Sequence, residues 1–145
     1  MQIYFICTGN TCRSPMAEAI LKHKQLSNIE VRSAGVYAHN GGAMSMNAKK
    51  VLLENGILEN HRSSEIDPLY IDQADVILTM TRSHLHALLQ YFPQAANKIY
   101  TLSEYVNGKA TDITDPYGGN IDVYRQTFEE LQQLVDALQS KILED

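Results

Sequence analysis

The chain is short of cysteine and has no long run of apolar residues, and each shortage removes a class of protein. Its 145 residues include two cysteines, Cys7 and Cys12, which lie too close together to staple distant parts of a fold. No stretch approaches the roughly 20 apolar residues needed to cross a bilayer. Residues 1–7 are apolar but lack a charged leader and a cleavage site, so they are interpreted as a strand. We expect a cytoplasmic protein with no membrane partner.

Basic clusters and nucleotide-binding motifs are also missing. The formal net charge is -5 and no run of Lys and Arg occurs, so no nucleic-acid partner is expected. Neither Gly-x-Gly-x-x-Gly nor a Gly-Lys-Ser/Thr loop is present, which disfavours a nucleotide enzyme. His84 and His86 have no Cys or carboxylate cluster beside them, so neither a metal nor another cofactor is expected. His39 and His61 are interpreted as solvated loop residues without a role.

The remaining pattern is an alternation of strand-like and helix-like segments. With 44% hydrophobic residues, the chain is long enough for one substantial core, and one domain over residues 1–145 is predicted. Strands are predicted at residues 2–7, 29–34, 74–79 and 98–102. Helices are predicted at residues 15–26 after an N-cap Ser14, at 45–55, between Thr81 and Pro93, and at 121–142. Residues 60–70 are predicted to be loop with one short helix, and residues 107–120 a long loop. This order indicates an α/β fold of three layers, with a parallel four-stranded sheet between helices.

The first loop has the composition of an anion site. It runs from Cys7 to Ser14, leaves the carboxyl end of the first strand and leads into a helix N-terminus, where ligands of such sheets bind. Five residues separate Cys7 from Arg13, enough for successive backbone N–H groups to curl around one tetrahedral anion. Gly9 and Asn10 tolerate the positive φ angles of such a curl. The Arg13 guanidinium adds a planar fork of donors for two phosphate oxygens.

Cys7 is the candidate nucleophile of this loop. A helix dipole, backbone amides and a guanidinium all favour a thiolate, and such settings lower a thiol pKa from about 8.5 to roughly 3.5–7.5. The Ser14 hydroxyl can stabilise the thiolate, cap the helix, or do both. Taken alone, Cys7 could equally be a buried apolar cysteine at the end of a strand. The whole string from Cys7 to Pro15 favours the catalytic interpretation.

The run Cys7 to Pro15 resembles the signature of low-molecular-weight protein tyrosine phosphatases. The resemblance covers nearly the whole chain, and its further elements are Ser33-Ala34-Gly35, Gly56-Ile57, His61-Arg62-Ser63, the strand Asp75 to Thr79 with Met80, and Asp115-Pro116-Tyr117. It implies a four-stranded parallel sheet and a thiophosphate enzyme intermediate. It also implies catalytic roles for Cys7, Arg13 and Asp115. The substrate-binding residues that it implies are Thr8, Gly9, Asn10, Thr11, Cys12, Arg13, Ser14 and Tyr117.

The role of Asp115 depends on this resemblance. The resemblance makes Asp115 the acid that protonates the leaving group and then the base that activates water. Pro116 restricts the backbone direction of the preceding residue, which suits a carboxylate held over a phosphate cradle. By itself, Asp-Pro-Tyr-Gly is typical of a plain turn.

Two departures from the tyrosine-specific pattern concern the substrate. Thr11 stands where those members usually carry a larger aliphatic residue, and the acid loop carries one aromatic, Tyr117, in place of two. The pattern resembles the bacterial protein-arginine phosphatase branch, which implies phosphoarginine as substrate. A planar guanidinium brings N–H donors that the Thr11 hydroxyl and an ionised Asp115 can engage. The alternative is an ordinary phosphotyrosine enzyme in which Thr11 is a neutral loop variant.

Other classes of function fit less well. The related arsenate reductases need further cysteines, and none follows Cys12. Cys7 and Cys12 are not spaced as Cys-x-x-Cys, so a disulfide between them is interpreted as reversible protection of the nucleophile: we expect oxidant to block activity and dithiothreitol to restore it. A non-catalytic module that binds phosphorylated proteins would not need Cys7 together with Asp115. Phosphorylated proteins are the expected partners, and a monomer is the expected state.

Overall fold

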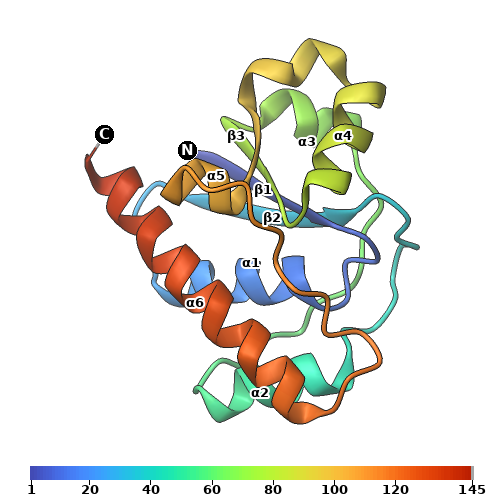
Figure 1. Ribbon diagram of the computed structural model, residues 1–145, viewed down its shortest axis with the longest axis vertical. Coiled ribbons are helices and arrows are strands. Elements are labelled where there is room, and N and C mark those ends of the chain that lie inside the picture. Colours follow the sequence, from blue (N-terminus) through green and yellow to red (C-terminus); the bar gives the residue numbers. More distant parts are fainter. Residues whose placement is uncertain (145) are drawn as a thin grey trace.

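The protein, described by a computed structural model over residues 1–144, has a sheet between two layers of helices (Figure 1). The strands are β1 (Gln2–Cys7), β2 (Glu30–Gly35), β3 (Val76–Thr79) and β4 (Ile99–Thr101). The helices are α1 (Arg13–His23), α2 (Met46–Glu54), α3 (Pro68–Gln73), α4 (Arg82–Tyr91), α5 (Leu102–Asn107) and α6 (Ile121–Glu144), with a 3₁₀ helix over Pro93–Lys98. The predicted α/β fold is confirmed.

The four strands are parallel and lie in the order β2-β1-β3-β4. The central strand β1 pairs on both sides, with Ile3 opposite Val31 in β2 and Val76 in β3. Every β1 residue after Gln2 is buried. Because helices cover both faces of the sheet, β1 is apolar throughout and does not alternate in the way of a half-exposed strand.

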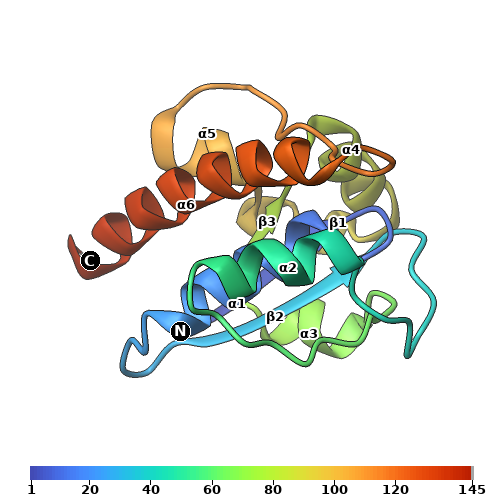
Figure 2. The same cartoon turned by 90° about the horizontal axis from the view of Figure 1, so that it is seen from below.

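The two faces of the sheet carry separate hydrophobic clusters. Ile3 and Phe5 pack into the larger cluster, with side chains from α1, α2 and α6. Tyr4 and Ile6 point the opposite way, into a cluster that includes Ile71 of α3 and side chains from α4. Seen from below, α2 lies beside α1 and α6 (Figure 2). Alternate β1 side chains therefore tie the sheet to both helical layers.

The start of α1 differs from the prediction. The helix begins at Arg13, two residues early, and Cys12 rather than Ser14 is its N-cap. The Ser14 side chain caps no backbone N–H of the helix and contacts other polar side chains instead. Pro15 is the third residue of the helix and lies within its first turn, where a missing N–H costs no helical hydrogen bond. The helix also ends at His23, before the predicted residue 26.

Helix α5 was not predicted, although the sequence carries its signal. Thr101 caps the helix by accepting the Glu104 N–H, and Thr-x-x-Glu is the pattern of a capping box. Gly108 ends α5 with a left-handed φ of 70°. The helix α3 begins at Pro68, at the end of the segment predicted to be loop with one short helix, and Asp67 caps it. The other strands and helices start and stop within two residues of their predicted bounds.

Among residues 1–144, the helices are either too short or too polar to cross a membrane.

Candidate active site

The loop after β1 is held tightly by the end of β2. The Val36 backbone N–H donates to the Cys7 carbonyl oxygen at 2.9 Å, which extends the strand pairing past the last β2 residue. Gly35 approaches so closely that a Cβ atom there would lie 2.3 Å from the Thr8 carbonyl oxygen. No larger residue fits at Gly35 unless the loop moves. The Ser33-Ala34-Gly35 segment therefore supports the loop from one side.

The loop bends over residues 8–12, and one residue supplies its unusual backbone angle. Asn10 has a φ of 57°, in the left-handed region that Asn tolerates better than most residues. Gly9 was also predicted to adopt a positive φ. It does not have one in the structure. A Cβ atom on Gly9 would first meet Thr11 Oγ1 at 3.7 Å, an ordinary contact.

The loop and the segment before α6 enclose a hollow of about 230 Å³. It lies at the carboxyl end of β1, where the loop before α6 also passes (Figure 1). Its lining residues are Cys7, Thr8, Gly9, Thr11, Cys12, Arg13, Asp115 and Tyr117. Asn10 and Ser14, predicted for the same site, are fully buried and lie outside this lining.

A hydrogen bond from Ser14 reaches the sulfur of Cys7. Cys7 is 3% exposed, and its Sγ lies 2.8 Å from Ser14 Oγ. Asn10 Nδ2 donates to Ser14 Oγ at 2.8 Å. Because an amide N–H can only donate, the Ser14 oxygen accepts there and has its own proton available for Cys7 Sγ. The geometry supports a thiolate, as the sequence predicted for Ser14.

Burial nevertheless raises the pKa of the Cys7 thiol above its ordinary value. The Ser14 hydroxyl, the backbone N–H groups of Ser14 and Asn10, and the Arg13 charge all lower this pKa, but burial outweighs them. The expectation of a lowered thiol pKa is therefore wrong for this arrangement. Desolvation of a charge at a nearly closed position is the physical reason.

Behind the loop, Asn10 is the centre of a buried polar network. Asn10 Nδ2 donates to Ser33 Oγ at 2.9 Å as well as to Ser14. Ser33 Oγ donates in turn to Glu18 Oε1 at 2.5 Å. His61 Nε2 donates to the backbone carbonyl oxygen of Asn10 at 3.0 Å and to its side-chain Oδ1 at 3.1 Å. His61 Nδ1 lies 3.7 Å from Glu18 Oε1. The network connects Ser14, the hydrogen-bond partner of Cys7, to the buried carboxylate of Glu18.

Several of these residues were not assigned by sequence reasoning. His61 was interpreted as a solvated loop residue, and that interpretation is wrong because its side chain is buried against Asn10. Glu18 carried one usable signal: it lies four residues after Ser14, so the two share a face of α1. Ser33 and His61 were noted only as parts of motifs. Their meeting at Asn10 depends on loops far apart in sequence.

Arg13 and Asp115 meet at the mouth of the hollow. Arg13 NH1 donates to the Ile113 carbonyl oxygen at 3.0 Å, and Arg13 NH2 lies 3.6 Å from Asp115 Oδ2. Asp115 also accepts the Tyr117 backbone N–H at 3.1 Å, so the predicted turn forms as well. Tyr117 is 81% exposed and lines the hollow. The carboxylate is half exposed, where it can meet an incoming molecule.

His84 is a second neighbour of the loop that the sequence did not reveal. It was interpreted as a surface or capping histidine, but its side chain is buried and its Nε2 lies 2.8 Å from Thr8 Oγ1. His86, two residues later, is exposed, which agrees with its interpretation as a surface histidine. His84 lies in the first turn of α4, which follows β3, the strand beside β1.

Cys12 lies away from bulk solvent next to α6. Its Sγ is 3.5 Å from the Tyr124 hydroxyl and 3.8 Å from Thr11 Oγ1. Ser45 Oγ donates to the same Tyr124 hydroxyl at 3.0 Å, and burial raises the Tyr124 pKa to about 12. Both cysteines are free thiols in this structure. A disulfide between them stays a prediction.

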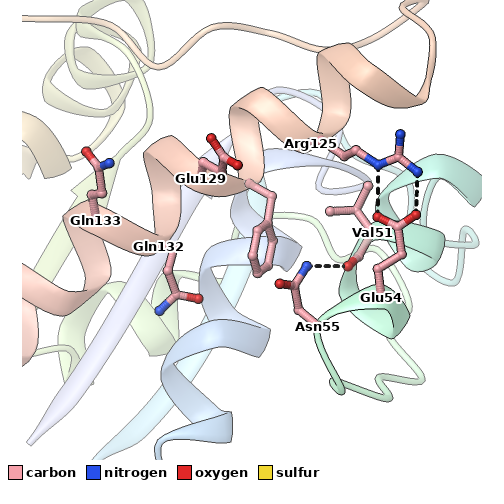
Figure 3. Close-up of a pocket in the computed structure, with 8 residues that line it drawn as sticks. Val51, Glu54, Asn55, Arg125, Glu129, Gln132 and Gln133 are labelled. Carbon is pink, nitrogen blue, oxygen red and sulfur yellow. Dashed lines mark hydrogen bonds and ion pairs between the residues drawn. The ribbon is translucent and has the colours of Figure 1, made fainter.

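A larger hollow of about 510 Å³ lies elsewhere, between α2 and α6 (Figure 3). The Arg125 guanidinium bonds both carboxylate oxygens of Glu54 across it, at 3.0 Å and 2.6 Å. Asn55 donates to the Val51 carbonyl oxygen at 2.8 Å. Figure 3 shows Glu129 and the Gln132 amide on the α6 side of the same hollow. The described residues that line it include no cysteine or histidine. The smaller hollow, which contains Cys7, is therefore the better candidate for the reactive site.

Within the part of the chain that the structure describes, no three His, Cys, Asp or Glu side chains gather in a way that could hold a metal ion.

Comparisons with known proteins agree with this geometry. The model of the family "Low molecular weight phosphotyrosine protein phosphatase" matches residues 2–145. A "Protein-arginine-phosphatase" of Geobacillus stearothermophilus is 49% identical over 97% of this chain and 95% of its own. The "Low molecular weight protein-tyrosine-phosphatase PtpB" of Staphylococcus haemolyticus (strain JCSC1435) is 42% identical, over 97% of this chain and 99% of its own.

A solved structure is similar over the whole chain. It is titled "YwlE arginine phosphatase - C7S mutant with phosphorylated active site serine" and is 42% identical. It aligns with a TM-score of 0.97 and covers 100% of this chain and 97% of its own. Since the family model spans nearly every residue and the relatives match end to end, the chain belongs to the low molecular weight phosphotyrosine protein phosphatase family.

Proposed function

We propose that the protein hydrolyses phosphoarginine side chains of proteins through a cysteinyl-phosphate intermediate. The observation that carries the proposal is the hollow in which Cys7, Arg13 and Asp115 meet, with the sulfur beneath the loop and the carboxylate at the mouth. The relatives named protein-arginine phosphatase support the choice of substrate. The proposed active molecule is a cytoplasmic monomer consisting of one domain over residues 1–145.

In the first step the Cys7 sulfur attacks phosphorus. The thiol has a raised pKa, so its proton must leave first, and a phosphoryl oxygen of the dianionic substrate, a strong hydrogen-bond acceptor, is in a position to take it. A sulfur–phosphorus bond forms and the phosphorus–nitrogen bond breaks. Protonated Asp115 gives its proton to the departing guanidino nitrogen. The Arg13 guanidinium holds two phosphoryl oxygens throughout.

In the second step a water molecule attacks the cysteinyl phosphate. Asp115, now a carboxylate, accepts a proton from this water, and the sulfur–phosphorus bond breaks to release inorganic phosphate. The Ser14 hydroxyl, 2.8 Å from Cys7 Sγ, stabilises the thiolate that leaves. The related structure titled with a phosphorylated active-site serine supports a covalent phosphoryl intermediate in this family.

Thr11 and Tyr117 are the proposed selectivity residues. Thr11 lines the hollow and contributes a hydroxyl where an aliphatic side chain would offer packing alone. A pocket built to hydrogen-bond its substrate rejects an analogue that lacks the matching groups, because buried polar atoms are left unpaired. The alternative function is a phosphotyrosine phosphatase, which the 42% identical PtpB relative favours. A non-catalytic phosphoprotein-binding module is the remaining alternative.

Parallel assays decide among these functions. Phosphate release is measured from a phosphoarginine protein and from a phosphotyrosine peptide, with wild type, Cys7→Ser and Thr11→Ile. Wild type should prefer phosphoarginine, Cys7→Ser should release none, and Thr11→Ile should shift the kcat/KM ratio towards phosphotyrosine by about tenfold or more. Thr111→Ile, an exposed threonine outside the hollow, is the control and should keep the wild-type ratio.

The opposite results are equally clear. A wild-type preference for phosphotyrosine would make the protein an ordinary tyrosine phosphatase in which Thr11 is incidental. Undiminished release by Cys7→Ser would exclude the cysteinyl intermediate. Binding of phosphoproteins without any release by wild type would favour the binding module.

A further inference from the structure

The Thr8 hydroxyl lies between two groups that the proposed mechanism does not connect. His84 Nε2 is 2.8 Å from Thr8 Oγ1, and Arg13 NH2 donates to the same oxygen at 3.5 Å. Thr8 lines the hollow beside Cys7. The hydroxyl is therefore shared by the phosphate-binding arginine and by a histidine that the sequence left without a role.

The histidine is neutral and has one unpaired ring nitrogen. His84 is 5% exposed, and its Nδ1 is a buried atom with no hydrogen-bond partner among the described residues. Burial and the nearby Arg13 charge lower the His84 pKa to about 4, although Asp112 and Asp115 act in the opposite direction. A neutral imidazole carries one proton, either on Nδ1 or on Nε2.

The unpaired Nδ1 indicates which nitrogen carries the proton. A buried N–H without a partner is rarer in proteins than a buried acceptor without one. A bare Nδ1 leaves the proton on Nε2, which then donates to Thr8 Oγ1. Arg13 can only donate, so it also uses a lone pair of Thr8 Oγ1. A hydroxyl has two lone pairs and one proton, and both lone pairs are now engaged.

We infer that His84 is a positioning residue, which holds the Thr8 hydroxyl so that its proton points into the hollow and donates to the bound phosphoryl group. The inference deepens the proposed function and rests on it for the identity of the bound group. A phosphoryl oxygen of the substrate can accept a hydrogen bond from this proton. The protonated guanidinium of the substrate cannot, because it has only donors. His84 thereby adds one fixed neutral donor beside the Arg13 fork.

The fold explains why His84 can do this. The helix α4 begins directly after β3, and Thr81 caps it by accepting the His84 backbone N–H at 3.2 Å. The cap fixes His84 in the first turn, and β3 lies beside β1, whose end bears Thr8. His84 therefore reaches the loop from an element that forms no part of the signature.

Phosphate binding by variants tests the role of His84. The dissociation constant of inorganic phosphate is measured by calorimetry, and kcat and KM are measured with p-nitrophenyl phosphate. His84→Leu and Thr8→Val should each weaken phosphate binding by about tenfold, the effect of one hydrogen bond to a charged group. The double variant should weaken it no further, because the two residues act through one proton. His86→Leu, on the exposed face of α4, should bind as wild type.

Conservative variants and nuclear magnetic resonance distinguish this role from a purely structural one. Thr8→Ser and His84→Gln keep the hydroxyl and a donor near the Nε2 position, so both should bind phosphate within about twofold of wild type. In wild type, the ring ¹⁵N shifts of His84 should place the proton on Nε2. A proton on Nδ1, wild-type phosphate binding by His84→Leu, or additive losses in the double variant would each overturn the inference.

The same data separate this inference from the proposed function. If wild type releases no phosphate from any substrate, the proposed function fails. The phosphate affinities and the ¹⁵N shifts still decide whether His84 orients Thr8.

Discussion

At the scale of single residues, the hydroxyl of Ser14 lies between two different partners. Asn10 Nδ2 donates to it at 2.8 Å, and Cys7 Sγ is 2.8 Å away on the other side. Asn10 can take this place because its backbone adopts a φ of 57°. The orientation of the Ser14 proton thus depends on a left-handed residue four positions earlier, and it opposes the rise in the Cys7 pKa that burial causes.

Replacing Ser14 by Ala should move the reactivity of Cys7 to higher pH. Iodoacetamide alkylates the thiolate, so the rate rises as pH increases through the thiol pKa. Ser14 lowers this pKa by donating to the thiolate, and its removal should shift the midpoint of the rate profile upward. The rate is followed by mass spectrometry of the peptide that contains Cys7.

Ser83→Ala, an exposed serine on α4, is the matched control and should keep the wild-type profile. A midpoint that stays in place or falls in Ser14→Ala would show that Ser14 does not donate to the sulfur.

At the scale of elements, α6 combines an apolar stripe with an exposed ion pair. Leu131, Val135 and Leu138 of α6 are fully buried in the larger cluster. On the other side of the same helix, Arg125 bonds Glu54 of α2 across the hollow of Figure 3. The first contact removes apolar surface from water, while the second joins two groups that remain solvated.

These contacts should differ strongly in their effect on stability. Leu131→Ala should lower the free energy of unfolding by about 2–5 kcal/mol, because it removes buried methyl groups and leaves a cavity. Arg125→Gln should change it little, since water already screens the exposed pair. Urea denaturation of both variants measures the difference. A larger loss in Arg125→Gln than in Leu131→Ala would mean that the ion pair, not the stripe, attaches α6.

At the scale of the whole molecule, exposed apolar side chains are scattered over many elements. The large exposed hydrophobic residues are Met1, Tyr37, Met46, Leu53, Leu58, Leu69, Tyr91, Tyr100, Tyr117 and Leu143. They come from helices, loops and a strand on both sides of the sheet. A formal net charge of -5 adds repulsion between copies.

The protein should therefore sediment as one species of 16.3 kDa at micromolar concentration. Stable interfaces usually bury more than about 1,000 Å² with good complementarity, and scattered residues do not supply such a patch. Sedimentation velocity over a hundredfold range of concentration measures this. A sedimentation coefficient that rises with concentration would contradict the proposed monomer.

The sequence alone determined the local features of this protein. Unbroken apolar runs predicted the buried strands, and the three-to-four-residue spacing of apolar side chains predicted α6, because both patterns follow from the period of one element. The spacing of Cys7 and Arg13 likewise placed an anion site in one continuous loop. The Thr-x-x-Glu cap of α5 was equally local, but Thr101 fell inside the strand predicted at residues 98–102 and residues 103–106 were assigned to no element.

Tertiary structure decided everything that depends on segments far apart in the chain. It brought Asp115 within 3.6 Å of the Arg13 guanidinium, placed His61 on Asn10, and placed His84 on Thr8. It also determined the direction of the Cys7 pKa shift, because the burial of one sulfur depends on all the elements that cover it. Residue order specifies which groups are neighbours along the chain. Desolvation and side-chain hydrogen bonds depend on which groups become neighbours in space.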